Sequence, residues 1–247
     1  MGNGNMLHPD RLLPGDPRTR DIARELYGSV RSLPIISPHG HTDPAWFAEN
    51  KPFGNPAELL ITPDHYVFRM LYSQGITLDQ LGITGTSDSR KSITDPRAVW
   101  RLFASNYHLF RATPSRIWLD HVFFEIFDFD VPLSGDTSDV YFDRIQALLG
   151  TEEFLPRHLF DKFNIELLAT TESPLDELIH HNTIIASDWD GRVITTFRPD
   201  PVTDPEFEGF STNVTLLGAL TGRDTASFQG YLAALQDRRQ YFQARGA

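Results

Sequence analysis

The chain has 247 residues, of which 40% are hydrophobic and 12% aromatic, so it is long and apolar enough for a packed globular protein. A formal net charge of -11 excludes the basic face that nucleic-acid binding requires, and an anionic small molecule would need a local cluster of arginines. The chain has no cysteine, which excludes disulfides, thiolate metal sites and a cysteine nucleophile. Any bound metal must therefore use histidine and carboxylate ligands.

The first residues show neither the charged nor the apolar region of a secretion signal. Apolar residues nowhere run long enough to span a bilayer. We therefore expect a soluble, cytoplasmic protein that binds neither membranes nor nucleic acid.

The first predicted elements are a helix and a strand. Asp16 followed by Pro17 is typical of a helix start, and apolar residues at four-residue spacing continue this helix to about residue 31. An apolar run over residues 33–36 predicts the first strand, which ends in His39-Gly40-His41. Residues 46–56, rich in Pro, Asn and Gly, predict a loop.

A long segment over residues 53–163 reads as helical. Capping residues followed by proline predict helix starts at Thr62-Pro63, Asp95-Pro96 and Thr113-Pro114. Further helices are expected over residues 139–149 and 156–163. The many aromatic and aliphatic residues of this segment are interpreted as core rather than as a cofactor stack, among them Trp100, Phe103, Tyr107, Ile117, Trp118 and Phe123.

The remaining residues alternate strand and helix. Residues 165–171 predict a buried strand, followed by a helix from Ser173-Pro174 to about His181. His180 and His181 are interpreted as residues of the last helical turn that interact with the helix dipole. Residues 192–197 predict a third strand, and two helices, over residues 212–220 and 225–245, follow it.

This alternation favours an α/β fold with a parallel sheet. A (β/α)8 barrel takes about 250 residues, yet only three strands are predicted here. Because an open sheet edge carries unpaired backbone groups, we interpret the chain as the N-terminal part of a (β/α)8 TIM-like barrel with a long helical insertion after the first strand. The alternative is a complete small α/β domain whose edge its own helices cover. We expect three parts in this chain. Residues 1–52 hold the N-terminal helix and the first barrel strand, residues 53–163 form the helical insertion, and residues 164–247 hold the second and third strand-helix units.

The pair His39 and His41 is the first candidate site. Side chains alternate in an extended backbone, so both imidazoles would project the same way and could share a metal ion. Spacing alone also fits a strand-end turn with two solvated imidazoles.

Taken together, the motifs resemble those of the uronate (glucuronate) isomerases, members of the amidohydrolase superfamily. The resemblance rests on residues 33–41, Asp64-His65-Tyr66 with Arg69 and Gly75, residues 161–175, and Thr196-Phe197-Arg198-Pro199-Asp200. It implies a barrel and the interconversion of D-glucuronate with D-fructuronate, or of D-galacturonate with D-tagaturonate. It also implies a divalent metal, expected to be zinc, and a homo-oligomer at full length.

The resemblance assigns roles residue by residue. His39 and His41 match the metal ligands, His65 and Tyr66 match the substrate-binding and proton-transfer pair, and Arg198 matches a substrate-binding cation. The chemistry agrees, because an aldose-ketose shift through an enediol needs a base near C2, a partner for the developing oxyanion and a clamp on the carboxylate. Tyr66 could act as the base if a neighbouring cation stabilised its phenolate.

Each assignment has a structural alternative. His65 and Tyr66 could be ordinary residues of a first helical turn, and Arg198 could simply pair with Asp200 on the surface. Asp43 and Glu172 lie near strand ends and are assigned no role.

The family's chains continue beyond this endpoint and supply a carboxylate ligand, a further histidine and more arginines. Catalytic zinc normally has three protein ligands, so we expect this chain alone to be nearly inactive. Two alternatives to the isomerase function remain: the chain could belong to a metal-dependent hydrolase of the same superfamily, or it could be an inactive truncated fragment.

Overall fold

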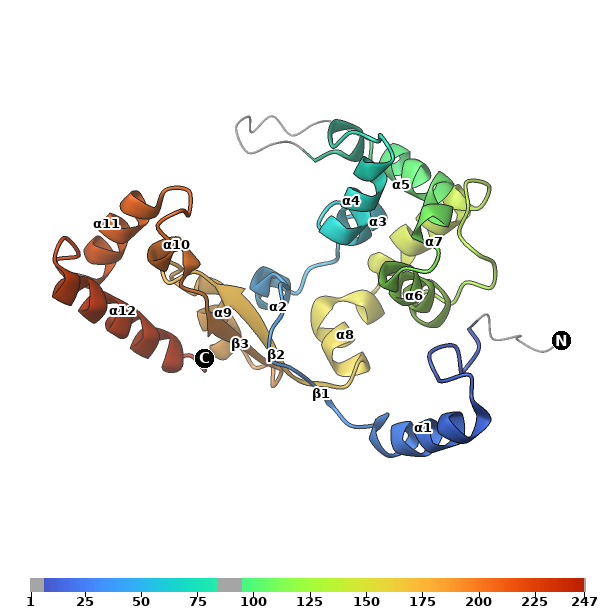
Figure 1. Cartoon of the computed structure of the whole chain (residues 1–247), viewed down its shortest axis with the longest axis horizontal. Coiled ribbons are helices and arrows are strands. Elements are labelled where there is room, and N and C mark those ends of the chain that lie inside the picture. The colour runs from blue at the N-terminus through green and yellow to red at the C-terminus, as the bar shows by residue number, and fades with distance from the viewer. Residues whose placement is uncertain (1–6, 84–94, 247) are drawn as a thin grey trace. The chain divides into compact units, whose positions relative to one another are not determined.

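The structure is a computed structural model that describes residues 7–83 and 95–246 (Figure 1). The chain divides into two compact units. The helical unit takes in residues 1–32 and 52–155, and the sheet unit takes in residues 33–51 and 156–247. This division groups the N-terminal helix with the helical segment.

The described residues of the helical unit form α-helices joined by short helical turns. The helices are α1 (Pro17–Val30), α3 (Pro56–Leu60), α4 (His65–Ser73), α5 (Pro96–Ser105), α6 (Pro114–His121) and α7 (Ser138–Leu149). The turns are η1 (Asp79–Leu81), η2 (Tyr107–Phe110), η3 (Val122–Ile126) and η4 (Glu152–Phe154).

Helix starts in this unit follow from side-chain capping. Asp16, Asp95 and Thr113 each accept a hydrogen bond from a backbone N–H in the first turn of α1, α5 and α6, which confirms those predicted starts. The predicted start at Thr62-Pro63 is wrong. Asp64 is the cap of α4, because its carboxylate accepts the backbone N–H of Tyr66 at 2.8 Å.

The core of the helical unit is aromatic, as predicted. Trp100, Phe103 and Phe123 are fully buried, and the Trp100 ring contacts both phenylalanines with centroids 5.5 and 6.1 Å away. The indole N–H of Trp100 donates to the Ser138 carbonyl oxygen at 2.9 Å. The prediction fails for Ile117 and Trp118, which are 41% and 38% exposed on α6.

The sheet unit holds β1 (Ile35–Ser37), β2 (Ile165–Glu172) and β3 (Arg192–Phe197), in the order β1-β2-β3 with both pairs parallel. Its helices are α2 (Pro44–Glu49), α8 (Pro156–Lys162), α9 (Ile179–Ile185), α10 (Asp200–Thr203), α11 (Phe210–Thr221) and α12 (Phe228–Gln243). The predicted α/β class with a parallel sheet is therefore confirmed. Within the described residues the sheet is three-stranded and open, without barrel closure.

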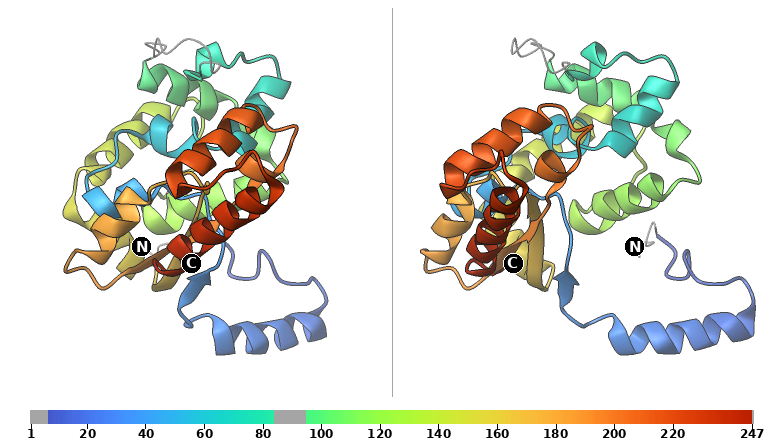
Figure 2. Two further views of the ribbon diagram at one scale, coloured as in Figure 1. Left: turned by 90° about the vertical axis from the view of Figure 1, so that its left-hand side faces the viewer. Right: turned by 60° about the vertical axis from the view of Figure 1, so that its left-hand side comes forward.

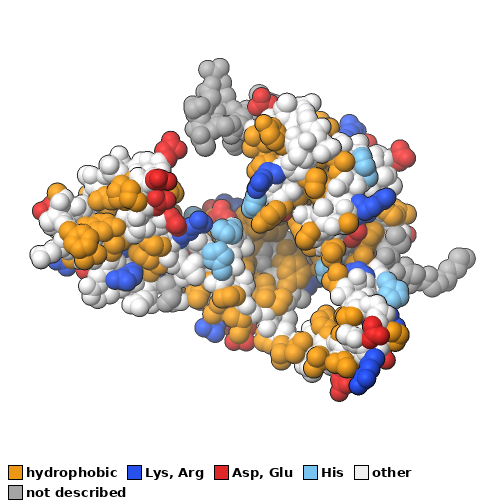
Figure 3. Space-filling view, viewed as in Figure 1, with side chains coloured by type: hydrophobic (Ala, Val, Ile, Leu, Met, Phe, Trp, Pro, Cys, Tyr) orange, Lys and Arg blue, Asp and Glu red, His pale blue; other side chains and the backbone are white. Residues whose placement is uncertain are grey.

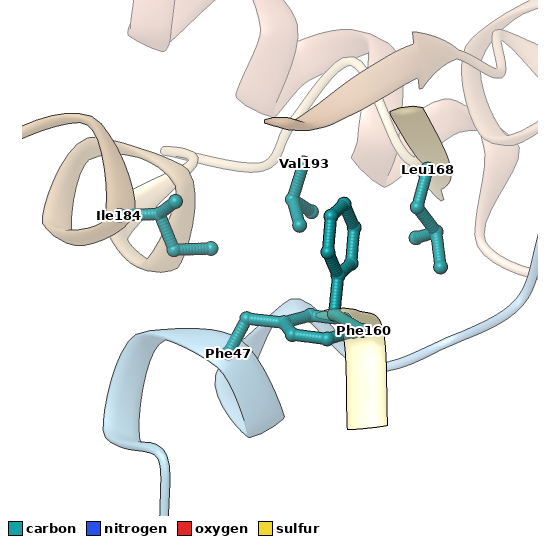
Figure 4. Packing of buried hydrophobic residues seen from close by; sticks show 5 residues of the cluster. All are labelled: Phe47, Phe160, Leu168, Ile184 and Val193. Atoms are coloured by element: carbon teal, nitrogen blue, oxygen red, sulfur yellow. The ribbon is translucent and has the colours of Figure 1, made fainter. Parts of the chain in front are cut away.

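Helices cover one face of this sheet. Because Leu168 pairs with Val193 in the parallel register, their side chains lie on the same face. Figure 4 shows them facing Phe160 of α8, with Phe47 of α2 and Ile184 of α9 completing the cluster. This face holds the apolar core of the sheet unit.

The other parts of the sheet remain open. Ile35 and Ile36 of β1 are 48% and 60% exposed, and other exposed apolar side chains are orange in Figure 3. On the second face, Leu167, Ala169 and Ile194 line a hollow of about 380 Å³ that α12 borders.

Helices α11 and α12 lie side by side after β3 (Figures 1 and 2). Val202 of α10, Leu217 of α11 and Ala234 of α12 form a small buried cluster. None of the helices in the described part of the chain has the length and apolar character to cross a membrane.

Two local predictions in the sheet unit are wrong. The predicted loop over residues 46–56 overlaps most of α2 and, in the other unit, the first residue of α3, because Asp43-Pro44 and Asn55-Pro56 are caps of the same kind as Asp16-Pro17. Helix α9 begins at Ile179, so His181 lies in a first turn and not in a last one.

Candidate active site

The two histidines predicted to bind metal lie directly after β1, between Ser37 and helix α2. Both side chains are exposed to solvent. Their ring centroids are 5.0 Å apart and the rings are nearly perpendicular, at 88°. The structure therefore places the two imidazoles next to each other at the carboxyl edge of the parallel sheet.

This separation fits a shared cation. With a Zn–N distance of about 2.1 Å and a tetrahedral angle at the metal, the centroids of two ligating imidazoles lie about 5 Å apart. The described residues contain no cluster of three or more His, Cys, Asp or Glu side chains suited to a metal. The pair therefore supplies two nitrogen ligands, and a third protein ligand would have to come from elsewhere.

Contacts with β2 hold Gly40, the residue between the two histidines, in place. The Thr171 hydroxyl donates to the Gly40 carbonyl oxygen at 2.8 Å. A Cβ atom at Gly40 would lie 3.2 Å from the Ala169 carbonyl oxygen, which is tighter than most real contacts. Asp43 accepts the backbone N–H of Ala45 at 2.9 Å and so begins α2 directly after the pair. Glycine at position 40 is thus explained by its close approach to β2.

Arg198 directly follows β3, at the same edge of the sheet as the histidine pair. Its backbone N–H donates to the Glu172 carbonyl oxygen at 3.0 Å, which continues the ladder between β2 and β3. Its exposed guanidinium donates from Nε to Asp200 at 2.7 Å. This hydrogen bond lowers the pKa of the Asp200 carboxyl. The predicted surface pairing is present, and it leaves the rest of the guanidinium in solvent.

The predicted proton-transfer pair lies in the helical unit. His65 and Tyr66 occupy the first turn of α4, where Asp64 caps the helix. Both side chains are exposed, Tyr66 by 67%, and their ring centroids are 4.2 Å apart.

A buried polar cluster at the end of β2 was not predicted as part of a site. Thr170, Glu172 and Thr195 are buried on the helix-covered face, with His181 of α9 against them. The Thr170 hydroxyl donates to the Glu172 carboxylate at 2.9 Å, and the Thr195 hydroxyl donates to the same oxygen. The His181 Nε2 atom lies 2.8 Å from the Thr170 hydroxyl.

Burial and charge act in opposite directions on His181. Burial lowers the pKa of the His181 imidazole, against the opposing effect of the nearby Glu172 carboxylate, whose oxygen is 3.8 Å from Nε2. The sequence signal for the cluster is the change from apolar residues to Thr-Thr-Glu within one strand. Its partner His181 carries no such signal, since only the tertiary fold brings α9 to this face.

A family model of glucuronate isomerase matches residues 17–247, which is almost the whole chain. The chain belongs to the glucuronate isomerase family. The resemblance seen in the motifs is thereby confirmed.

Relatives of this family span more residues than this chain. The uronate isomerase of Sphingopyxis alaskensis is 62% identical over 245 residues, and that of Xanthomonas euvesicatoria is 61% identical over 241 residues. Each alignment covers 98% of this chain and 51% of the relative. The chain therefore spans about half the length of the curated relatives it matches.

Solved structures of the family agree with this fold. The crystal structure of glucuronate isomerase from Caulobacter crescentus matches with a TM-score of 0.94 and 52% identity, over 98% of this chain and 50% of that one. The uronate isomerase structure from Thermotoga maritima matches with a TM-score of 0.84 and 28% identity, over 97% of this chain and 50% of that one.

Proposed function

We propose that this chain forms the first part of the active site of an aldose-ketose isomerase that acts on a hexuronate. The expected reaction interconverts D-glucuronate and D-fructuronate, with D-galacturonate and D-tagaturonate as the second pair of substrates. The observation that carries the proposal is the adjacent imidazole pair after β1, at the same sheet edge as Arg198, in a member of the glucuronate isomerase family. Family membership favours this function over a metal-dependent hydrolase.

The proposal includes a (β/α)8 barrel that the rest of a full-length protein completes. Among the described residues, β1 and β3 each pair along one edge only, and β1 exposes Ile35 and Ile36. The uncovered face of β2 and β3 is also apolar. A closed barrel would pair the backbone groups of both edge strands with further strands. It would also bury the apolar face and so remove its contact with water. We likewise expect the whole protein to be cytoplasmic and homo-oligomeric.

His39 and His41 would hold a divalent metal, for which zinc suits two imidazole ligands. When bound, such a metal supplies polarisation of the sugar's carbonyl and hydroxyl oxygens. The exposed imidazoles leave room for the further protein ligands that a catalytic site requires.

The proton transfers belong to side chains in this proposal. Tyr66, as its phenolate, takes the proton from C2 and returns it to C1, while His65 donates a hydrogen bond to the developing oxyanion. The hydroxyl proton moves from the oxygen on C2 to the oxygen on C1, so that the isomerisation neither gains nor loses an atom. Arg198 binds the substrate carboxylate through the guanidinium nitrogens that Asp200 leaves in solvent.

A chimera tests the proposal. Residues 1–247 would be joined to the second half of the Sphingopyxis alaskensis uronate isomerase, which is 62% identical over the aligned part. We expect the purified chimera, loaded with zinc, to convert D-glucuronate to D-fructuronate, and His41→Ala to lower kcat/KM at least about 100-fold. His158→Ala is the matched control, because His158 is an exposed histidine of the same unit on α8.

The same chimera tests the carboxylate clamp. Arg198→Ala should raise KM for glucuronate about tenfold or more, since one charged contact to the substrate is lost. Arg192→Ala, an exposed arginine at the opposite end of β3, should leave KM unchanged. An active chimera that tolerates His41→Ala would refute the metal-dependent mechanism. Equal effects of both arginine substitutions would refute the role of Arg198.

A further inference from the structure

We infer that Thr171 is a positioning residue for the histidine pair, because its hydroxyl fixes the peptide that joins the two proposed ligands. The inference rests on the proposed function for the identity of the ligand that the pair binds. The tether itself is a feature of the metal-free chain and can be measured separately.

The contact is specific in its geometry. Thr171 lies near the carboxyl end of β2, and its hydroxyl donates to the Gly40 carbonyl oxygen at 2.8 Å. Gly40 is the single residue between His39 and His41. The hydrogen bond therefore fixes the plane of the peptide that leads into His41, and with it the direction in which that side chain leaves the backbone.

The donor side chain is itself held in place. Threonine is branched at Cβ, which restricts the rotation that carries the hydroxyl. Thr196 pairs with Thr171 in the register of β2 and β3, and its hydroxyl oxygen is 3.3 Å from that of Thr171. The Thr196 hydroxyl also donates to the Thr170 carbonyl oxygen at 2.7 Å. The tether thus connects Gly40 to the two strands behind it.

Close packing supports the same position. The Gly40 backbone lies close to the Ala169 carbonyl oxygen, and a Cβ atom at position 40 would be only 3.2 Å from that oxygen. The segment is exposed on its other side, where both histidines face solvent. Because a metal site loses affinity when its ligands are free to move, a single hydroxyl at this point is well placed to control metal binding.

The experiment uses Thr171→Val, which keeps the branched shape but removes the hydroxyl, and Thr171→Ser, which keeps the hydroxyl. Thr183→Val is the matched control, since Thr183 is an exposed threonine on α9 whose hydroxyl bonds to its own helix. Backbone ¹⁵N relaxation of the metal-free chain measures the order of Gly40 and His41. Competition with a chromogenic chelator measures the Kd for zinc.

We expect the order parameters of Gly40 and His41 to be about 0.85 in the wild-type chain and to fall below about 0.6 in Thr171→Val. The Kd for zinc should rise about tenfold in the same variant. Thr171→Ser should restore both values, and Thr183→Val should change neither.

Unchanged order parameters in Thr171→Val would overturn the inference, whatever the zinc measurement shows. Loss of order in Thr171→Ser to the same extent as in Thr171→Val would also overturn it, because the hydroxyl would then not be the cause. If the chimera and its His41→Ala variant bind zinc equally weakly, the metal part of the proposed function fails, while the relaxation data still decide the role of Thr171.

Discussion

Helices α5, α6 and α7 of the helical unit and the three-stranded sheet of the sheet unit differ in how they bury apolar residues, although α1 of the helical unit buries none of its own. In the helical unit, Trp100, Phe103 and Phe123 are wholly shielded from solvent by neighbouring helices. In the sheet unit, one face of the sheet is covered, yet Ile35 and Ile36 of β1 are largely exposed. The helical core is built from whole helices that meet, whereas the sheet has strands at its edges.

The physical reason is the hydrogen bonding of the backbone. A helix satisfies its backbone groups internally, so a few helices can enclose a core once their apolar sides meet. A strand needs a neighbour on each side, so three strands leave two edges unpaired. A few helices can therefore enclose a core by themselves, whereas a parallel sheet needs neighbours for its edge strands.

The largest effect that tests this comparison is expected in the helical core. Trp100→Ala should lower the free energy of unfolding by about 3–5 kcal/mol, because it removes a fully buried ring and leaves a cavity. Urea unfolding followed by circular dichroism measures the change. Trp118→Ala is the control, since this tryptophan is 38% exposed and should cost about 1 kcal/mol or less. Equal costs would show that the aromatic core is not the main source of stability.

A smaller effect separates the two faces of the sheet. Leu168→Ala should destabilise the sheet unit by about 2–4 kcal/mol, because Leu168 packs in the cluster that the helices cover. Leu167→Ala, one residue earlier on the open face, should cost less than about 1.5 kcal/mol. Native-state hydrogen exchange of peptides from β2 and β3 measures both changes. A larger cost at Leu167 would mean that the open face is already covered in solution.

The smallest expected effect is a pH dependence confined to the sheet unit. The pKa of His181 is lowered by burial, so the unfolded chain binds more protons than the folded chain once the pH falls below about 6.5. The free energy of unfolding should therefore be highest above that pH. It should decrease as the pH falls below it, towards the lowered pKa of His181 in the folded state. Urea midpoints at pH 7.5 and 5.5 measure the decrease.

Two variants identify the group responsible. His181→Gln should lose part of the decrease in midpoint between pH 7.5 and 5.5, while His158→Gln, at an exposed position, should retain all of it. If both variants keep the wild-type decrease, His181 is not the group that titrates.

Much of the local structure could be predicted from the sequence. Asp16-Pro17 and Asp95-Pro96 marked helix starts because a capping carboxylate and a preset proline act within one turn. The same rule would have found α2 at Asp43-Pro44, where a loop was predicted instead. The third strand was predicted with its observed bounds, Arg192–Phe197, because its apolar residues are flanked by turn-forming ones.

The sequence by itself thus determined the α/β alternation, the histidine pair and the family. Only the tertiary structure decided which face of β2 is covered, that His181 is buried in a first helical turn, and that Thr171 reaches Gly40 across 131 positions in the chain. These features depend on strand register and helix placement, which act between residues distant in sequence. Local patterns are set by the preferences of a few neighbouring residues and carry no record of such long-range contacts.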